Sequence, residues 1–435
     1  MNYTMKTSGA ACAMLLAFML PTGISGADAT DGKYTGPGSC GSTSCHGGVR
    51  PRSDNAVLQN EYTTWTLHDK HARAASLLTN EVGTRMGKIL GITPSKEQRC
   101  LVCHSLNVTE EQKTRSFDTG DGVSCEACHG PASNWLGPHT TRGWQYEKSI
   151  ALGMTNLRDP VSRAEKCLGC HLGDSTRSVD HELIAAGHPD LYFELNSFTA
   201  VMPSHWKEMD KDPFYDLRLL ATGQGVALRE NLKRISRNAS KFWPEYAELD
   251  CFTCHHSLVG AKDSWRQARG YPDRRPGNPP WNSSRYTVYR VILNQVDHDS
   301  ATRLEAGIKR VDDLVSDIRA NPSQIAQAAE AASGTADEIA KRMPKLQMDG
   351  AAGWKLIKAI TASSDRIAGA GERSAEQAAM VLDSLFVASN GGAPAGNGSQ
   401  VGAAITALFP LVENPSAYNP NSFAQQMRRV GALVP

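Results

Sequence analysis

Four segments of the chain repeat one pattern, in which two cysteines with two residues between them are followed directly by a histidine. The segments are CLVCH (100–104), CEACH (125–129), CLGCH (167–171) and CFTCH (251–255). In this spacing the thiols lie about one helical turn apart, so both can add to the vinyl groups of one haem. The adjacent imidazole can then bind the iron as its proximal ligand. The pattern therefore predicts covalently attached c-type haem at each segment.

A fifth segment, CGSTSCH (40–46), has four residues between its two cysteines. We interpret it as a looped-out version of the same motif, which brings the expected number of haems to five. The cysteines predicted to attach haem are Cys40, Cys45, Cys100, Cys103, Cys125, Cys128, Cys167, Cys170, Cys251 and Cys254. The histidines predicted to be proximal iron ligands are His46, His104, His129, His171 and His255.

Three other kinds of cysteine site compete with haem attachment. Five disulfides would suit an even number of cysteines in an exported protein. The pairs at 100–103 and 125–128 resemble a zinc ribbon, but 21 residues separate them and each carries a histidine that zinc would not need. A redox cysteine pair would need a thioredoxin-like βαβ context, which the sequence does not predict. The regular histidine favours haem over all three.

Eight further histidines lie outside the five motifs, and one of them, His256, directly follows a proximal ligand. They are candidates for the sixth coordination position of the irons. His139 follows GPASNWLGP, whose glycines and prolines turn the chain sharply, so we predict that it binds the iron of a neighbouring haem. His205 is another candidate, whereas His256 and His298 are expected to be structural.

Two pairs of histidines leave the choice of ligand open. His68 and His71 lie in WTLHDKHARAASLL, which resembles a helix with Leu67, Ala74, Leu77 and Leu78 towards a core, and we favour His71. His181 and His188 lie in DHELIAAGHPDLYFEL, a helical segment that Gly187 and Pro189 should end. Of these two we favour His188.

The elements that must position these residues are predicted to be mainly α-helical. The haem motifs span residues 40–255, a segment of 216 residues, which leaves about 43 residues for each of five haems. So short a segment cannot build an apolar core around every haem. We therefore expect a multihaem cytochrome c fold with little regular sheet, in which the haems form the core.

The chain beyond Ser300 has no cysteine and a strong helical pattern. Residues 302–321 place apolar side chains on one stripe, and Asn321 with Pro322 should end this helix and start the next. Further helices are expected over about 325–343, 353–368 and 375–388. The stripe consists of Leu304, Ile308, Val311, Leu314, Val315 and Ile318. This region is predicted to be a haem-free helical bundle, or a helical wrap on the haem region.

The predicted organisation has four parts. Residues 1–27 resemble a secretory signal peptide, with Lys6 before a short apolar run and small residues near Ala27. A pentahaem cytochrome c domain (28–260), a connector rich in proline and arginine (261–299) and the helical region (300–435) follow. The protein is thus expected in the periplasm or outside the cell, with no membrane span after signal cleavage. With 46 basic and 45 acidic residues, nothing suggests binding to nucleic acid.

At this point a family resemblance becomes specific. CLVCH, GDGVSCEACHGPASNWLGPH and CLGCHLGD, preceded by the first motif and WTLHDKHARA, resemble the cytochrome c554 family of tetrahaem electron carriers over about 36–174. The resemblance implies cross-ligation, with His46 paired to His139 and His129 paired to His71. It also implies that the haem on His104 lacks a sixth ligand from the protein.

Three features depart from that family: the expanded first motif, the fifth motif at Cys251 and the long haem-free tail. The sequence also has no Cys-x-x-Cys-Lys, so the lysine-ligated catalytic haem of pentahaem nitrite reductases is absent. Nitrite reduction of that type is therefore disfavoured.

The leading functional prediction is an electron carrier with five haems. Irons with two histidine ligands have no open position, so they exchange electrons rather than bind substrate. Redox partner proteins are expected, docked through the helical region. One alternative is an oxidoreductase that acts on a small nitrogen or sulfur compound at a five-coordinate haem on His104, and another is a haem-bearing subunit that docks through residues 300–435. The question of catalysis stays open at this point, with a carrier favoured over an enzyme.

Overall fold

The computed structural model describes residues 32–435 except 55–56, 175, 208–211, 213, 256–277 and 391–399. These residues are mainly helical, and extended pairing among them is limited to the isolated bridges Tyr34–Lys113 and Leu249–Trp281. The predicted mainly α fold class is confirmed. The predicted signal peptide, 1–27, lies outside the described residues. Across the described chain, no helix has the length and apolar character that a membrane span requires.

The described chain consists of α-helices joined by loops and short 3-10 helices. The α-helices before residue 205 are α1 (Glu61–His68), α2 (Glu81–Leu90), α3 (Gln98–His104), α4 (Cys125–His129), α5 (Tyr146–Ala151), α6 (Pro160–His171), α7 (His181–Ala185) and α8 (Leu195–Val201). Those that follow are α9 (Tyr215–Lys241), α10 (Ser284–Val296), α11 (His298–Val315), α12 (Pro322–Ala340), α13 (Ala352–Ala362), α14 (Ser364–Gly369), α15 (Glu372–Ser389), α16 (Gln400–Thr406) and α17 (Pro420–Leu433). The 3-10 helices used below are η2 (Lys70–Arg73), η3 (Ala75–Leu78), η7 (Pro138–Thr140) and η9 (Cys251–Thr253).

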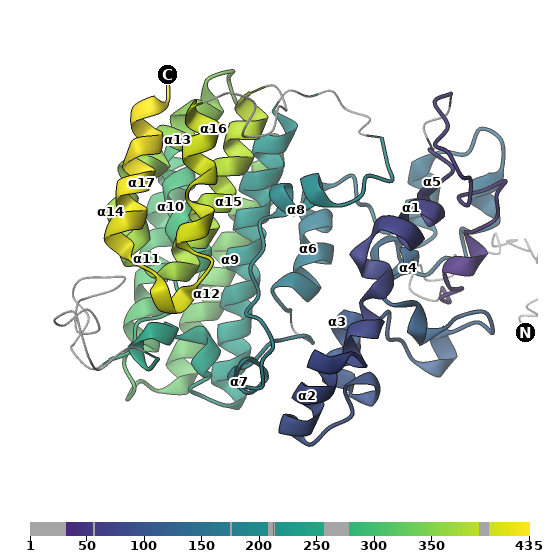
Figure 1. Cartoon of the computed structure of the whole chain (residues 1–435), viewed down its shortest axis with the longest axis horizontal. Coiled ribbons are helices and arrows are strands. Elements are labelled where there is room, and N and C mark those ends of the chain that lie inside the picture. The colour runs from purple at the N-terminus through teal and green to yellow at the C-terminus, as the bar shows by residue number, and fades with distance from the viewer. Residues whose placement is uncertain are drawn as a thin grey trace, which may run out of the picture.

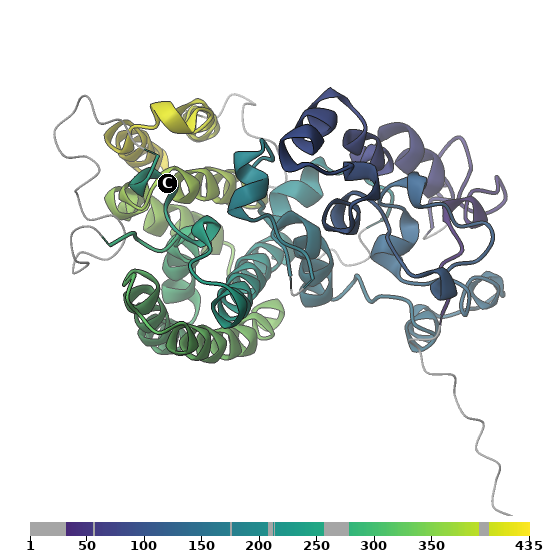
Figure 2. The same ribbon diagram turned by 90° about the horizontal axis from the view of Figure 1, so that it is seen from below.

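The helices form two halves (Figure 1). α1 to α5, in purple and blue, lie on one side, and α10 to α17, in green and yellow, lie on the other. α6 and α8 lie between them, beside α9. The view from below shows the same separation (Figure 2). We call the first set, residues 32–207, the haem-motif half and the second set, residues 214–435, the helical half.

The helical half is built around one apolar core that runs from Leu217 to Val434. α9 packs along α12 and also contacts α6, α8 and α10. Two glycines of α9 allow this close approach. A Cβ at Gly223 would lie 2.7 Å from Leu195 Cβ, and one at Gly225 would lie 2.9 Å from Tyr289 Oη. Side chains at these positions would push α8 and α10 away from α9.

The predicted stripe of the helix after Ser300 is buried at four positions of that helix and partly buried at Leu314. Leu304, Ile308, Val311 and Val315 are at most 2% exposed. Ile318, by contrast, is 73% exposed, so its place on the stripe was wrong. The reason is that α11 ends at Val315, and the helical spacing no longer applies beyond it. The next helix starts as predicted, with the Asn321 side chain accepting a hydrogen bond from the Ser323 amide and Pro322 in the first turn.

The helical half starts earlier in the sequence than residue 300. α9 and α10 both contribute to its core, although α9 falls in the predicted haem domain and α10 in the predicted connector. Residues 261–277 of that connector lie outside the described residues. The basic, proline-rich composition that suggested a connector therefore applies to the part of 261–299 that precedes α10.

Residues 32–163 of the haem-motif half have very little apolar core of their own. Among those that the structure describes, the buried apolar side chains are Leu78, Ala132 and Trp135, with two prolines, Pro37 and Pro94. A folded segment of this length normally buries many more, because apolar burial is the main force that offsets the loss of chain entropy. Something other than protein side chains is therefore expected to fill the interior of residues 32–163.

The stretch around His71 differs from its predicted helix. α1 ends at His68, and two 3-10 helices follow, η2 and η3. The break occurs because the Asp69 side chain accepts a hydrogen bond from the His71 amide and so starts a new turn. Leu67 and Leu77 are consequently 59% and 49% exposed, while Leu78 is buried as expected.

Candidate haem-binding sites

Three of the cysteine–histidine motifs occupy the last turn of an α-helix. α3, α4 and α6 each end at the histidine of their motif, His104, His129 and His171. Cysteines three positions apart on a helix project to the same side of it. Both thiols of a motif therefore face one ligand, and the chain is free to turn away directly after the histidine.

The expanded first motif closes in the same way as the regular ones. In the fifth motif, which begins with η9, the His255 amide donates a hydrogen bond to the Cys251 carbonyl, at 2.8 Å. In the first motif, the His46 amide donates to the Cys40 carbonyl, at 3.2 Å, across two additional residues. The insertion is looped out, and the first cysteine and the histidine keep the relation they have in CFTCH.

The cysteine thiols of different motifs lie side by side. The Cys40 thiol lies close enough to that of Cys125 to perturb its pKa, and the same holds for the thiols of Cys103 and Cys170. Among the described residues, no disulfide joins any two of the ten cysteines. Neighbouring motifs are therefore packed closely enough for the groups attached to them to be adjacent.

Four of the five motif histidines face a second histidine across a nearly constant distance. The ring centroids are 6.2 Å apart for His46 and His139, 6.0 Å for His171 and His71, 6.3 Å for His104 and His188, and 6.2 Å for His255 and His181. Two metal–imidazole bonds of about 2 Å each, extended by half the width of both rings, put the centroids about 6 Å apart. Each pair therefore has the spacing that one shared metal ion requires.

His129, the proximal histidine of the third motif, lies near His205. Burial lowers the pKa of His129 to about 4, and the neighbouring His205 adds to this effect. The Nδ1 atom of His129 is buried without a hydrogen-bond partner. His205, a predicted ligand, is thus the candidate second histidine for this motif.

Most of these histidines are held through Nδ1, which leaves Nε2 to bind a metal. Backbone carbonyls accept from His104 (Ala74 O, 3.1 Å) and from His139 (Trp135 O, 3.1 Å). His188 and His205 lie within 2.7 Å of Pro189 O and 3.2 Å of Pro203 O, respectively.

At two other histidines, the group that holds Nδ1 is a carboxylate instead of a backbone carbonyl. His46 Nδ1 lies 2.8 Å from Glu61 Oε2, and His71 Nδ1 lies 2.8 Å from Asp69 Oδ1. These hydrogen bonds raise the pKa of each histidine.

Two further motif histidines, His104 and His171, are held neutral by their surroundings. Burial lowers the pKa of His104, and burial with the nearby His71 lowers the pKa of His171 to about 4. A neutral imidazole has the free lone pair that a metal ligand needs. The environment of these rings therefore suits ligation.

The structure separates the two pairs of histidines that the sequence left open. His68 is exposed at the end of α1, while His71 faces His171, as the preference for His71 requires. His188 and His181 both face a motif histidine, whereas the sequence favoured His188 of the two. No local signal could have selected His181 as well, because its partner, His255, lies 74 positions later in the chain.

Two pairings implied by the family resemblance differ from the observed ones. The resemblance pairs His71 with His129, but the structure places His71 against His171. It also leaves His104 without a second ligand, but the structure places the His188 ring opposite it. The implied pairing of His46 with His139 agrees with the structure, in which the two nearly parallel rings have centroids 6.2 Å apart.

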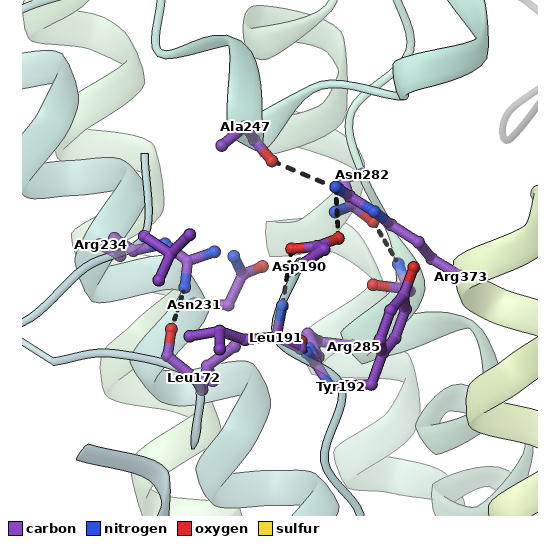
Figure 3. A pocket seen from close by; sticks show the side chains of 12 residues that line it. Leu172, Asp190, Leu191, Tyr192, Asn231, Arg234, Ala247, Asn282, Arg285 and Arg373 are labelled. Atoms are coloured by element: carbon purple, nitrogen blue, oxygen red, sulfur yellow. Dashed lines mark hydrogen bonds and ion pairs between the residues drawn. The ribbon is translucent and has the colours of Figure 1, made fainter. Parts of the chain in front are cut away.

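A buried cluster of arginines holds the histidine-bearing segments against the helical half (Figure 3). Arg234 of α9 donates to the carbonyl of Leu172, the residue after His171, at 2.7 Å. Arg373 of α15 forms an ion pair with Asp190, two residues after His188. Burial lowers the pKa of Arg285 of α10 to about 10, so it stays charged at neutral pH while it donates to the carbonyl of Leu191.

The comparisons with known proteins match part of the chain. Residues 40–130 match the model of the family described as cytochrome c554 and c-prime. Cytochrome c-554 of Nitrosomonas europaea is 26% identical over 178 residues, which cover 37% of this chain and 67% of that protein. No solved structure matches the chain. These findings confirm the resemblance that the motifs predicted.

Proposed function

Since the chain is a cytochrome c554-like multihaem cytochrome, we propose that it transfers electrons between redox partner proteins through five covalently attached c-type haems. Covalent c-type haem follows from the family, and the number five from the five motifs. The proposed thioether and iron ligands are Cys40, Cys45, His46 and His139; Cys100, Cys103, His104 and His188; Cys125, Cys128, His129 and His205; Cys167, Cys170, His171 and His71; and Cys251, Cys254, His255 and His181.

The observation that carries the proposal is the constant spacing of the histidine rings. Four motif histidines each face a second histidine at 6.0–6.3 Å, although the partners come from unrelated parts of the chain. Ordinary packing would not repeat one separation four times. A shared iron gives a physical reason for it, because metal–nitrogen bond lengths vary little.

The small apolar core supports the same proposal. So few buried apolar side chains cannot hold residues 32–163 together. Porphyrin rings have large apolar faces, and several of them would supply the missing interior. The helical half has its own core and carries only the fifth motif.

The protein residues have separate tasks in this proposal. The cysteines fix each haem in position, and the carbonyls and carboxylates at Nδ1 orient the imidazoles. When bound, haem supplies an iron that exchanges one electron at a time. The adjacent thiols of Cys40 and Cys125, and of Cys103 and Cys170, bring neighbouring attachment sites together, which favours transfer between them.

The alternative of a catalytic haem on His104 is not favoured. That reading needs an open coordination position, and the His188 ring lies opposite His104 with its Nδ1 held by a backbone carbonyl. The proposal further includes export to the periplasm or beyond, based on the signal-like segment 1–27, and redox partners that dock through residues 300–435.

The test is the haem content and ligation of the purified holoprotein. Intact mass spectrometry should give the mass of the processed chain plus five haems. The absorption spectrum of the reduced protein should not change on addition of carbon monoxide, because no iron has a free position. Fewer than five haems would overturn the number, and carbon monoxide binding in the unmodified protein would overturn complete ligation by histidine pairs.

Substitution of His188 provides a positive control for this test. In His188→Ala we expect one haem to become high-spin and to bind carbon monoxide, because His104 loses its facing ring. The matched variant His298→Ala changes an exposed histidine of α11 and should leave every haem low-spin. A low-spin spectrum in His188→Ala would refute the proposed pairing at His104.

A further inference from the structure

Two of the proposed iron ligands differ from the others in the group that holds Nδ1. His46 donates to Glu61 and His71 donates to Asp69, each at 2.8 Å. The corresponding group at His104 and at His188 is a backbone carbonyl. A carbonyl is neutral, whereas a carboxylate places a full negative charge one imidazole ring away from the bound metal.

Both carboxylates are shielded from solvent, so their charge acts strongly. The Asp69 side chain is 4% exposed and the Glu61 side chain is 17% exposed. Water and salt screen buried charges much less than exposed ones. Backbone amides close in the sequence hold each carboxylate in place. Asp69 accepts a hydrogen bond from the His71 amide, and Glu61 accepts from the amides of Leu58 and Gln59.

We propose that Glu61 and Asp69 are positioning residues that lower the reduction potentials of two haems, those ligated by His46 and by His71, relative to the haem ligated by His104 and His188. This inference rests on the proposed function, because it requires haem iron at these histidines. A carboxylate bonded to the imidazole raises the basicity of the ligand and favours the more positive ferric iron over the ferrous one. Among these three haems, electrons that enter the protein therefore settle first on the one held by carbonyls.

Asp69→Asn tests this idea with little change in structure. One oxygen of Asp69, Oδ1, accepts from both the amide and Nδ1 of His71. An asparagine oxygen can accept both bonds, and asparagine starts a helical turn as well as aspartate does. The variant thus removes the charge and keeps the geometry. In Glu61→Gln the amide can still accept from Leu58 and Gln59, but its NH₂ group then faces His46 and breaks the bond.

The measurement is a spectroscopic potential titration of the full-length holoprotein, in which each ferric iron takes one electron from dithionite and becomes ferrous. For each variant we expect one haem to become easier to reduce. Loss of a group that orients a metal ligand typically changes metal-site properties about tenfold or more. A tenfold rise in the ferrous-to-ferric ratio at a fixed solution potential corresponds to about 59 mV for a one-electron couple.

The haem that shifts should be a different one in the two variants, and the low-spin spectrum should be retained in Asp69→Asn. Because Asp69 also interacts electrostatically with His205, a smaller shift is expected at the haem on His129. Asp69→Glu, which keeps the charge, should restore most of the potential. Glu147→Gln, a matched loss of charge at an exposed site of α5, should shift none of the haems.

The outcomes separate this inference from the proposed function. If the unmodified protein lacks low-spin haem with two histidine ligands, the proposed function fails. If it has such haems but Asp69→Asn and Glu61→Gln leave every potential within the shift seen in Glu147→Gln, the inference alone is refuted. A fall in potential in either variant would also refute it, because the sign of the electrostatic effect would be wrong.

Discussion

Glu126 lies between the two cysteines of CEACH, and we predict that it ties the start of the chain to the third motif. Its side chain belongs to a residue that is 2% exposed. Oε1 accepts from the Ala132 amide (2.7 Å) and the Thr35 amide (2.9 Å), and Oε2 accepts from the Gly36 amide (2.7 Å). Thr35 and Gly36 directly precede the first motif. One carboxylate thus holds three backbone amides from two distant segments.

The perturbation is Glu126→Gln, which keeps the size of the side chain and removes its charge. Only one of its two terminal groups can accept hydrogen bonds. Whichever way the amide turns, its NH₂ group faces an N–H donor, so Gly36 or Ala132 loses its acceptor. A buried donor without an acceptor costs about 1–3 kcal/mol, and the remaining bonds lose their charge assistance. The expected loss of local stability is about 3 kcal/mol.

Hydrogen exchange of the holoprotein, followed by mass spectrometry of peptides, measures this loss locally. The peptide that covers residues 32–39 should exchange on the order of 100-fold faster in Glu126→Gln, because about 1.4 kcal/mol corresponds to a factor of ten. The control Glu147→Gln changes an exposed glutamate and should leave this peptide unchanged. If exchange in Glu126→Gln stays within about threefold of the unmodified protein, Glu126 does not hold the two segments together.

Three further predictions test the ligands, the core and a buried acid. In His139→Ala, electron paramagnetic resonance should detect one new high-spin ferric haem, and an unchanged low-spin count would exclude His139 as a ligand. Leu228→Ala in α9, at a residue that is 0% exposed, should lower the free energy of unfolding in denaturant by about 2–5 kcal/mol, whereas Leu67→Ala, at a 59% exposed residue, should lower it by less than about 0.5 kcal/mol. Burial, with the charge of Glu372, raises the pKa of Glu376 from 4.5 to about 7. The folded state therefore holds the proton of Glu376 more tightly than the unfolded state does. The stability that this proton contributes is fully present below pH 4.5 and is lost as the pH rises through 7. After discounting for partial solvent exposure, Glu376→Gln should therefore be more stable than the unmodified protein by about 1–2 kcal/mol at pH 8 but not at pH 4, and equal thermal midpoints at pH 8 would contradict this.

The features that could be predicted from the sequence depend on neighbours within one or two helical turns. Asn321 and Pro322 start α12 as expected, because a capping side chain and a fixed proline φ act within one turn. The buried stripe of α11 follows from helical spacing in the same way. The prediction failed at Ile318, where the helix had already ended, and around His71, where the side chain of Asp69 started a new turn.

The histidine pairs depend on tertiary structure, and the sequence could only narrow the candidates. His188 follows its partner His104 by 84 positions, and His181 precedes His255 by 74. Such separations leave no periodic signal. The family resemblance supplied one pair that agrees with the structure, His46 and His139, of which only His46 lies within residues 40–130, the part that the family model covers. His181 and His255 lie beyond residue 130, the end of that match.

The burial of Glu126 shows a second kind of information that the sequence lacks. The two residues between the cysteines of a haem motif are unspecified in the pattern, so nothing marks them for a structural role. In this chain one of them, Glu126, binds the segment before the first motif, and another, Leu168 of CLGCH, is 1% exposed and packs in a small core with Leu219 and Val226 of α9. The haem motifs are thus also the points at which distant segments join.

The position of α9 gives the helical half a physical connection to the proposed electron-transfer sites. One face of α9 contributes Leu217 and Leu228 to the core of the helical half, while another packs Leu219 and Val226 against the helix that ends at His171. The same helix carries Arg234, which holds the carbonyl after His171. A rigid helix with two buried faces transmits the packing of one side to the other, because neither interface can shift without opening the other. The C-terminal helices therefore help to fix the orientation of His171, in addition to any contact that they make with a partner.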